Sequence, residues 1–130
     1  MTTAAPQHPI PHPEEAAVRL PLELYMRGHA EDCAAHMRAA FLPSARLESV
    51  REGPLASWTL DVYCQRFNNT PAADEALRRR RIDWLDITGT SAMAKVTLEH
   101  GAVTFTDYFV LLKTEAGWKI ANKAFHAQPQ

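Results

Sequence analysis

The second half of the chain alternates between apolar and other residues with a period of two, which is the period of β-strands. In the segment 92–98 every second residue is Ala, Val or Leu, and the residues between them include a lysine and a threonine. Two longer apolar segments, 103–112 and 118–123, follow, with turns at His100–Gly101 and Glu115–Gly117. The pattern predicts a four-stranded antiparallel meander in this half of the chain.

The first half has the 3.6-residue periodicity of helices. We expect helices over residues 14–27 and 30–41, and a third from a Thr59 cap to Phe67. Acidic residues lie in the first turn of each helix, where they interact favourably with the positive end of the helix dipole. A short strand is predicted over 46–51, and residues 72–77 are predicted to form a loop or a short helical turn.

Three residues set the expected helix boundaries. Pro21 is expected to kink or divide the first helix, because it lacks an amide donor and clashes with the preceding turn. Gly28 is expected to end that helix as a left-handed cap. Pro43 is expected to stop the second helix.

This order of elements predicts the α+β class. We expect three N-terminal helices packed on a strongly curved antiparallel sheet, which forms a cone with an internal cavity. The length of 130 residues fits a single hydrophobic core. We expect one domain over residues 14–127, preceded by a disordered arm over residues 1–13, which contains four prolines and two histidines.

Composition argues against several classes of protein. The formal net charge of -1 argues against a broad nucleic-acid-binding surface. No segment is apolar enough to span a membrane, and the N-terminus lacks the pattern of a secretory signal. We therefore expect a cytoplasmic protein, with Cys33 and Cys64 as reduced thiols.

Motifs for metals and phosphates are also missing from the sequence. No two histidines have i, i+4 spacing within a predicted helix, and there is neither a Cys-x-x-Cys motif nor a Gly-rich phosphate loop. We expect no metal and no cofactor.

Three local patterns resemble a known superfamily. They are Tyr-Met-Arg-Gly at 25–28 with Phe-Leu-Pro-Ser-Ala at 41–45, Glu-Gly-Pro-Leu at 52–55, and Thr-Asp-Tyr-Phe-Val-Leu at 106–111 followed by Gly-Trp-Lys-Ile-Ala-Asn-Lys at 117–123. Their order resembles the nuclear transport factor 2-like superfamily of cystatin-like cones. The branch that matches best is labelled lumazine-binding and lies near the SnoaL-like proteins.

The resemblance implies a range of activities rather than one, since fold does not fix function. Members include isomerases, dehydratases, polyketide cyclases and binding proteins, and homodimers are common among them. In the enzymes, an Asp, His or Tyr inside the cone acts on a proton next to a carbonyl or hydroxyl group. An apolar cavity raises the pKa of a carboxylic acid, which can tune it as a base.

Asp107 is the leading candidate for such a carboxylate. It shares strand parity with Phe105 and Phe109, so the three side chains should point the same way. It would act as a base or a hydrogen-bond anchor, and the alternative is a purely structural carboxylate. Asn122 has the parity of Trp118 and would hold a substrate oxygen, or else crosslink strands.

Other side chains complete the predicted cavity. Candidates for a proton donor are Tyr25, Tyr63 and His36, each with ordinary packing or exposure as the alternative. Asp86 is a second carboxylate candidate. Candidates for contact with a ligand are Trp58, Trp84, Phe105 and His126. His29 is expected at a helix junction, His100 in a turn, and Arg78–Arg81 at a solvated strand start with Glu75 and Asp83 nearby.

Two functional hypotheses follow. The first is a cone that binds a small apolar carbonyl or hydroxyl compound; if it is an enzyme, we expect cofactor-free proton transfer of the isomerase, dehydratase or cyclase type. The second is a non-catalytic, homodimeric protein-interaction module. In both, strands that are apolar on both faces predict a homodimer through the outer sheet face, because three helices cover only one side.

Overall fold

The computed structural model describes residues 11–130, so most of the predicted arm over residues 1–13 lies outside the described residues. Four helical segments are present: α1 (Glu15–Glu31), α2 (Ala34–Ala40), α3 (Leu60–Cys64) and the 3-10 turn η1 (Glu75–Leu77). The strands are β1 (Phe41–Val50), β2 (Leu55–Thr59), β3 (Arg79–Thr88), β4 (Ser91–His100), β5 (Val103–Thr114) and β6 (Gly117–Pro129).

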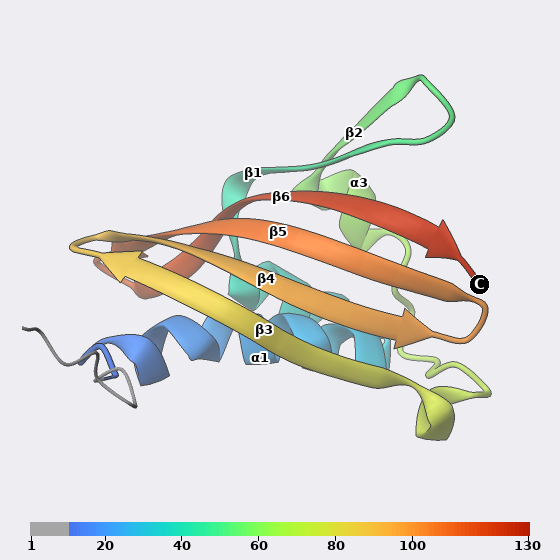
Figure 1. Ribbon diagram of the computed structural model, residues 1–130, viewed down its shortest axis with the longest axis horizontal. Helices are drawn as coiled ribbons and strands as arrows, with labels where there is room; N and C mark the ends of the chain where they lie inside the picture. Colours follow the sequence, from blue (N-terminus) through green and yellow to red (C-terminus); the bar gives the residue numbers. More distant parts are fainter. Residues whose placement is uncertain (1–10) are drawn as a thin grey trace, which may run out of the picture.

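The six strands form one curved, open sheet in the order β2-β1-β6-β5-β4-β3. The helices lie on one side of it, and β1 and β2 extend away from the other strands (Figure 1). The α+β class and the meander β3 to β6 are confirmed. The sheet is mixed rather than purely antiparallel, because β1 pairs with β6 in parallel.

The β1–β2 region was the least accurately predicted. β1 begins at Phe41 instead of Arg46, and β2 was not predicted. Pro43 does not stop a helix but lies within β1, where the pairing with β6 is interrupted between Phe41 and Arg46. A residue without an amide donor is tolerated there because no ladder hydrogen bond is required of it.

Helix α1 continues past Gly28, so the prediction that Gly28 ends it was wrong. The left-handed C-cap is Asp32, with a φ of 54°. Gly28 instead lies against α2, where an added Cβ would come within 2.8 Å of Met37 Cε. The glycine therefore makes room for the Met37 side chain of α2. Pro21 is buried within α1 and does not divide it.

The hydrophobic core lies between α1 and the inner face of the sheet. Val18, Leu22 and Tyr25 of α1 are fully buried, as are inward-facing residues of β4 to β6 such as Val96 and Leu111. No helix of residues 11–130 is both long and apolar enough to cross a membrane.

Two register shifts reverse the side-chain alternation within strands. In β3 the pairing with β4 shifts between Ile82 and Trp84, and in β6 the pairing with β5 shifts between Ile120 and Asn122. A β-bulge inserts one unpaired residue, so residues beyond it point to the opposite face from the one that strict alternation predicts. The bulge at Ala121 decides which side chains of β6 enter the interior.

Candidate functional site

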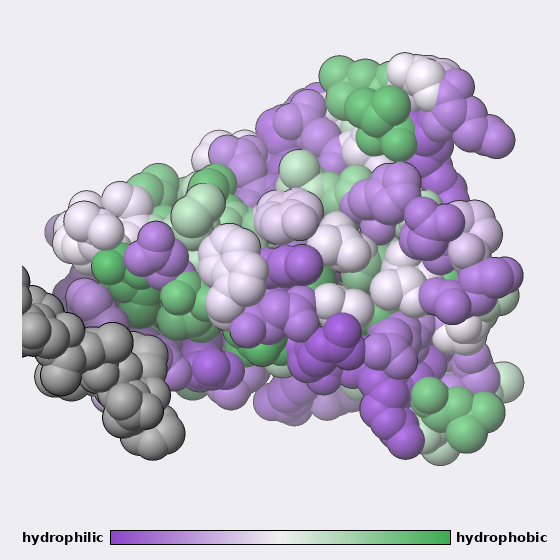
Figure 2. Space-filling model, in the orientation of Figure 1, coloured by the Kyte–Doolittle hydropathy of each residue, from purple (hydrophilic) through white to green (hydrophobic). Residues whose placement is uncertain are grey.

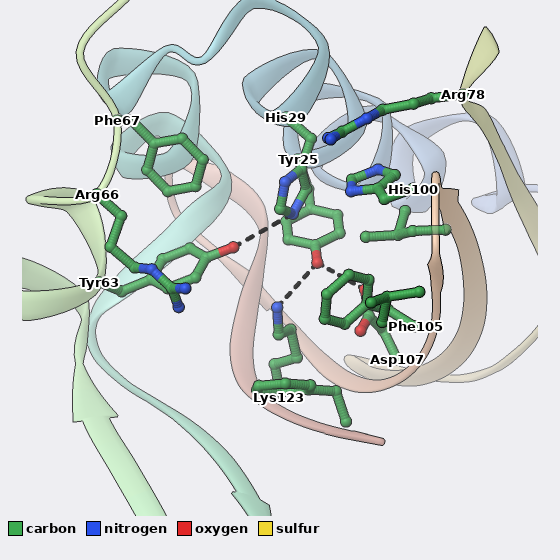
Figure 3. A pocket seen from close by; sticks show the side chains of 13 residues that line it. Tyr25, His29, Tyr63, Arg66, Phe67, Arg78, His100, Phe105, Asp107 and Lys123 are labelled. Atoms are coloured by element: carbon green, nitrogen blue, oxygen red, sulfur yellow. Dashed lines mark hydrogen bonds between the residues drawn. The ribbon is translucent and has the colours of Figure 1, made fainter. Parts of the chain in front are cut away.

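A cavity of about 400 Å³ lies between the helices and the concave face of the sheet. Its walls come from α1, α3, the segment that follows α3, Arg78 before β3, and strands β4, β5 and β6 (Figure 3). The lining side chains are Tyr25, His29, Tyr63, Arg66, Phe67, Arg78, Leu98, His100, Val103, Phe105, Asp107, Lys123 and Phe125.

Three buried polar side chains form a hydrogen-bonded chain in this cavity. The Tyr25 hydroxyl donates to Asp107 Oδ2 over 2.6 Å, and Lys123 Nζ donates to the Tyr25 hydroxyl oxygen over 2.8 Å. Asp107 and Tyr25 are fully buried, and Lys123 is 5% exposed. The phenol of Tyr25 therefore bridges an amine and a carboxyl group that come from neighbouring strands (Figure 3).

Burial and mutual attraction act in opposite directions on this pair. Desolvation raises the pKa of Asp107, whereas the Lys123 charge and the Tyr25 hydrogen bond oppose the rise. Desolvation lowers the pKa of Lys123, and the Asp107 charge opposes that change. Burial also raises the pKa of Tyr25 well above its ordinary value. Both pKa shifts favour the neutral forms of Asp107 and Lys123. Less energy is therefore needed to move a proton from the Lys123 amine to the Asp107 carboxylate.

Each partner keeps hydrogen-bonding capacity for a ligand. Asp107 Oδ1 is buried and has no hydrogen-bond partner among the described residues. An amine has more N–H groups than the one that Lys123 donates to Tyr25. A buried acceptor without a partner is costly unless something binds to it.

Aromatic rings enclose the amine. Lys123 Nζ lies 4.8 Å from the ring centroid of Tyr25, 4.9 Å from that of Tyr63 and 4.7 Å from that of Phe125. Ring faces attract an ammonium but also exclude water from it, and desolvation is the larger effect on the pKa of Lys123. The amine therefore lies among aromatic rings, and Asp107 is the acidic residue among the described lining side chains.

Two histidine rings also line the cavity, with 5.2 Å between their centroids. His29 Nε2 lies 3.3 Å from the Tyr63 hydroxyl, and His100 Nε2 accepts from Arg80 Nε over 3.0 Å. Burial lowers the pKa of His29 well below its usual range, and burial with the Arg80 charge lowers the pKa of His100 to about 4. Both rings are therefore neutral at pH 7.

Arginines line the outer part of the cavity. Arg78 Nε donates to Asp74 over 2.9 Å, and the Arg66 guanidinium lies 6.0 Å from the ring centroid of Trp58. Glu75 and Asp83 pair with Arg80 and Arg81, as predicted for the arginine run, but the Arg80 side chain is only 10% exposed rather than solvated. The lining has three cationic side chains, Lys123, Arg66 and Arg78, against one carboxyl group.

The structure brings four of the predicted site residues together. Tyr25, Tyr63, Phe105 and Asp107 all line the cavity. Trp58 lies one layer behind, with its ring stacked on that of Phe125 at 6.0 Å between centroids. Whether these residues bind or react with a ligand stays a prediction.

Other predicted site residues lie outside the cavity. Because of the bulge at Ala121, Asn122 is exposed and its Oδ1 accepts from the Arg46 amide, so the expectation that it points inward with Trp118 was wrong. The bulge in β3 likewise leaves Trp84 and Asp86 exposed on the outer face.

The two remaining histidine candidates are also outside the cavity. His126 is exposed and lies beside Gln128, because the same bulge turns it outward. His36 lies on the far side of α2, where its Nε2 is 3.0 Å from Glu31 Oε1.

Sequence reasoning missed Lys123, His29 and His100 as cavity residues. A signal for Lys123 was present: Trp118 and Ile120 are apolar at even positions, but the next aromatic residue, Phe125, is at an odd position. That change of parity indicates a bulge, and Lys123 shares the parity of Phe125. His29 follows Tyr25 by four residues, so a helix continued past Gly28 places both on one face.

Removing both members of the buried pair should cost less than the two single removals added together. We expect Lys123→Met to lower the free energy of unfolding by about 3 kcal/mol, because it leaves the buried Asp107 carboxyl group without the opposite charge nearby. The double variant Asp107→Asn/Lys123→Met should lose clearly less unfolding free energy than Asp107→Asn and Lys123→Met lose in sum. Urea unfolding at pH 7 measures all three.

Lys119→Met is the matched control, since Lys119 Nζ donates only to the Ala39 carbonyl at the surface. It should lower the free energy of unfolding by less than about 1 kcal/mol. Additive effects at Asp107 and Lys123 would show that no energy is coupled through Tyr25.

Comparison with known proteins agrees with the fold. Residues 13–126 match the family described as "Putative lumazine-binding". Among curated proteins, none matches the chain.

Solved structures give the same result. An NTF2-like protein of unknown function from Shewanella baltica is 27% identical, with a TM-score of 0.80 over 90% of this chain and 95% of that chain. A second NTF2-like protein of unknown function, from Methylobacillus flagellatus, is 29% identical, with a TM-score of 0.77 over 92% and 95%.

A ketosteroid isomerase-like protein from Erwinia carotovora atroseptica is 13% identical, with a TM-score of 0.65 over 91% of this chain and 98% of that chain, and at this identity it supports the fold alone. The family match spans nearly the whole chain and agrees with the resemblance found in its motifs. The chain therefore belongs to the "Putative lumazine-binding" family of nuclear transport factor 2-like proteins.

Proposed function

We propose that the protein binds a small planar carbonyl or hydroxyl compound in its cavity and transfers a proton on it without a cofactor. The observation that carries the proposal is the buried Oδ1 of Asp107, which has no hydrogen-bond partner within residues 11–130 and lies in a cavity that also holds the Lys123 amine. A base beside a hydrogen-bond donor is what proton abstraction next to a carbonyl requires.

The roles follow from the contacts. Asp107 Oδ1 would accept a proton from the ligand, because desolvation raises its pKa and makes it a stronger base than an exposed carboxylate. Lys123 would donate an N–H to the ligand oxygen and stabilise negative charge that develops there. Tyr25 would hold both groups in place through its two hydrogen bonds.

Cavity size and charge define the expected ligand. A volume of about 400 Å³ lies near the lower end of the range for small-molecule sites, roughly 300–1,000 Å³. Phe105 and Phe125, whose rings are tilted by 54° to each other, give the cavity an aromatic wall, and aromatic rings pack well against an unsaturated ligand. Arg66 and Arg78 in the outer part favour an acidic group at the other end. The ligand is thus more polar than the apolar compound predicted from the sequence.

Hydrogen–deuterium exchange at carbon tests this proposal. We expect the protein to accelerate exchange of the methyl protons of 4-acetylbenzoate in D₂O, followed by proton NMR. Asp107→Asn keeps an acceptor for Tyr25 but removes the base, so it should lower the rate by about a hundredfold or more.

Asp86→Asn is the control, because Asp86 is exposed on the outer sheet face and should not affect exchange. Circular dichroism would check that both variants are folded. Undiminished exchange in Asp107→Asn would contradict the proposed role of Asp107.

We further propose that a second copy of the chain covers the outer face of the sheet. Five large apolar side chains on this face are 43–50% exposed: Trp84, Met93, Tyr108, Val110 and Leu112. Figure 2 shows pale and green side chains among purple ones over the strands. An apolar patch of this kind is typical of an interaction site.

Charge placement supports a second copy as the partner. The strand register puts Lys95, Tyr108, Ala124 and Glu48 in one row across four strands. A two-fold axis parallel to the strands, between Tyr108 and Ala124, would bring Lys95 of one copy opposite Glu48 of the other. The same apolar patch would then face itself.

Charge reversal tests the dimer. Lys95→Glu and Glu48→Lys should each weaken dimerisation at least about tenfold, and the double variant should restore it, because the pair is exchanged across the axis. Size-exclusion chromatography with light scattering measures the change. A monomeric wild type, or a double variant weaker than both single ones, would contradict this arrangement.

A further inference from the structure

Lys123 differs from the other lysines of the chain in its surroundings. Of four lysines in the sequence, it alone lines the cavity. Lys113 pairs with Glu14, Lys119 donates to the Ala39 carbonyl, and Lys95 lies beside Tyr108 on the outer sheet face. A lysine in an apolar pocket next to a proton acceptor can act as a nucleophile, whereas an exposed lysine at pH 7 is almost fully protonated.

We propose that Lys123 is an amine nucleophile that forms a covalent imine with the carbonyl carbon of a planar aldehyde or ketone bound in the cavity. The proposal rests on three observations together: the amine is buried among three aromatic rings, it is hydrogen-bonded to Tyr25, and Tyr25 is in turn hydrogen-bonded to a carboxyl group. It depends on the proposed function only in taking a carbonyl compound as ligand.

The hydrogen-bond chain supplies a route for the proton that the amine must lose. Lys123 passes one proton to the Tyr25 oxygen as Tyr25 passes its own proton to Asp107 Oδ2. The result is a neutral amine, an unchanged phenol and a protonated carboxyl group. Desolvation of Lys123 and of Asp107 favours this neutral pair relative to the same pair in water.

The covalent step then balances without any other reagent. The neutral amine attacks the carbonyl carbon and forms a carbinolamine, whose hydroxyl leaves as water after Asp107 returns the proton. The product is a protonated imine at Lys123 with the Asp107 carboxylate as its counter-ion. One C=N bond replaces one C=O bond, one water molecule is released, and nothing is oxidised or reduced.

A protonated imine would also assist the proposed proton transfer. It withdraws electrons from the neighbouring carbon more strongly than a carbonyl group does, and Asp107 Oδ1 has no other partner with which to compete for the proton. Lys123 would then be a catalytic residue of the cavity as well as a hydrogen-bond donor.

Reductive trapping tests the proposal. The full chain is incubated at pH 7 with 4-carboxybenzaldehyde and sodium cyanoborohydride, which reduces an imine to a stable secondary amine. Peptide mass spectrometry then locates the carboxybenzyl group. We expect modification of Lys123 at least about tenfold faster than that of Lys95, Lys113 and Lys119, because only Lys123 lies in the cavity that would bind the aldehyde and is joined through Tyr25 to a proton acceptor.

Variants separate nucleophilicity from access. Lys123→Arg keeps a cation in the cavity but cannot form an imine, so carboxybenzylation in this region should vanish. Asp107→Asn makes Lys123 easier to deprotonate but removes the carboxyl group that returns the proton to the carbinolamine hydroxyl. Loss of water should then be slower, so labelling of Lys123 should slow relative to that of the α-amine of Met1 in the same sample. Circular dichroism checks the fold of each variant.

The outcomes distinguish the two proposals. No label at Lys123 of the wild type, or labelling equal to that of the exposed lysines, would overturn the imine. If 4-acetylbenzoate exchange nevertheless depends on Asp107, the proposed function survives without the covalent step. If Lys123 is selectively labelled but no exchange occurs, the imine stands and the proposed proton transfer fails.

Discussion

The hydroxyl group of Tyr25 is the contact on which the interior of this protein depends. It donates to Asp107 on β5 and accepts from Lys123 on β6, and it is carried by α1, so a single oxygen atom connects the longest helix to the two longest strands. Without this bridge, an amine and a carboxyl group would be buried with fewer partners, at a cost of several kcal/mol each. The cavity can hold charged groups because they are arranged as a connected chain.

Two local features of the backbone create this arrangement. The bulge at Ala121 turns Lys123 and Phe125 toward α1, whereas strict alternation would have turned Asn122 inward. Gly28 makes room for the Met37 side chain of α2, and α1 continues past it to Glu31, which places His29 one turn beyond Tyr25. The site therefore follows from one strand irregularity and one tight helix contact, and both lie within well-packed parts of the fold.

These features also explain how far the sequence could predict the structure. The meander and the inward direction of Asp107 were predictable, because β5 pairs with β4 without a register shift and its burial alternates over residues 107–112. The inward direction of Lys123 was not predictable by strict alternation, because alternation fails beyond a bulge. His29 was missed because Gly28 was predicted to end the helix. β2 was missed because five residues give a weak periodic signal. In each case tertiary contact overrode the local pattern.

The chemistry that we propose follows from low solvation. Burial raises the pKa of the Asp107 carboxyl group and lowers that of the Lys123 amine. The Tyr25 hydroxyl between them lets a proton pass from one to the other. The most direct test of this account is a pH titration of the Lys123 side chain by carbon-13 NMR, in the wild type and in Asp107→Asn. The account predicts a pKa below that of lysine in model peptides, about 10.4, and a further decrease in the variant, which lacks the carboxylate charge. A Lys123 side chain that titrates at the model-peptide value in both proteins would contradict it.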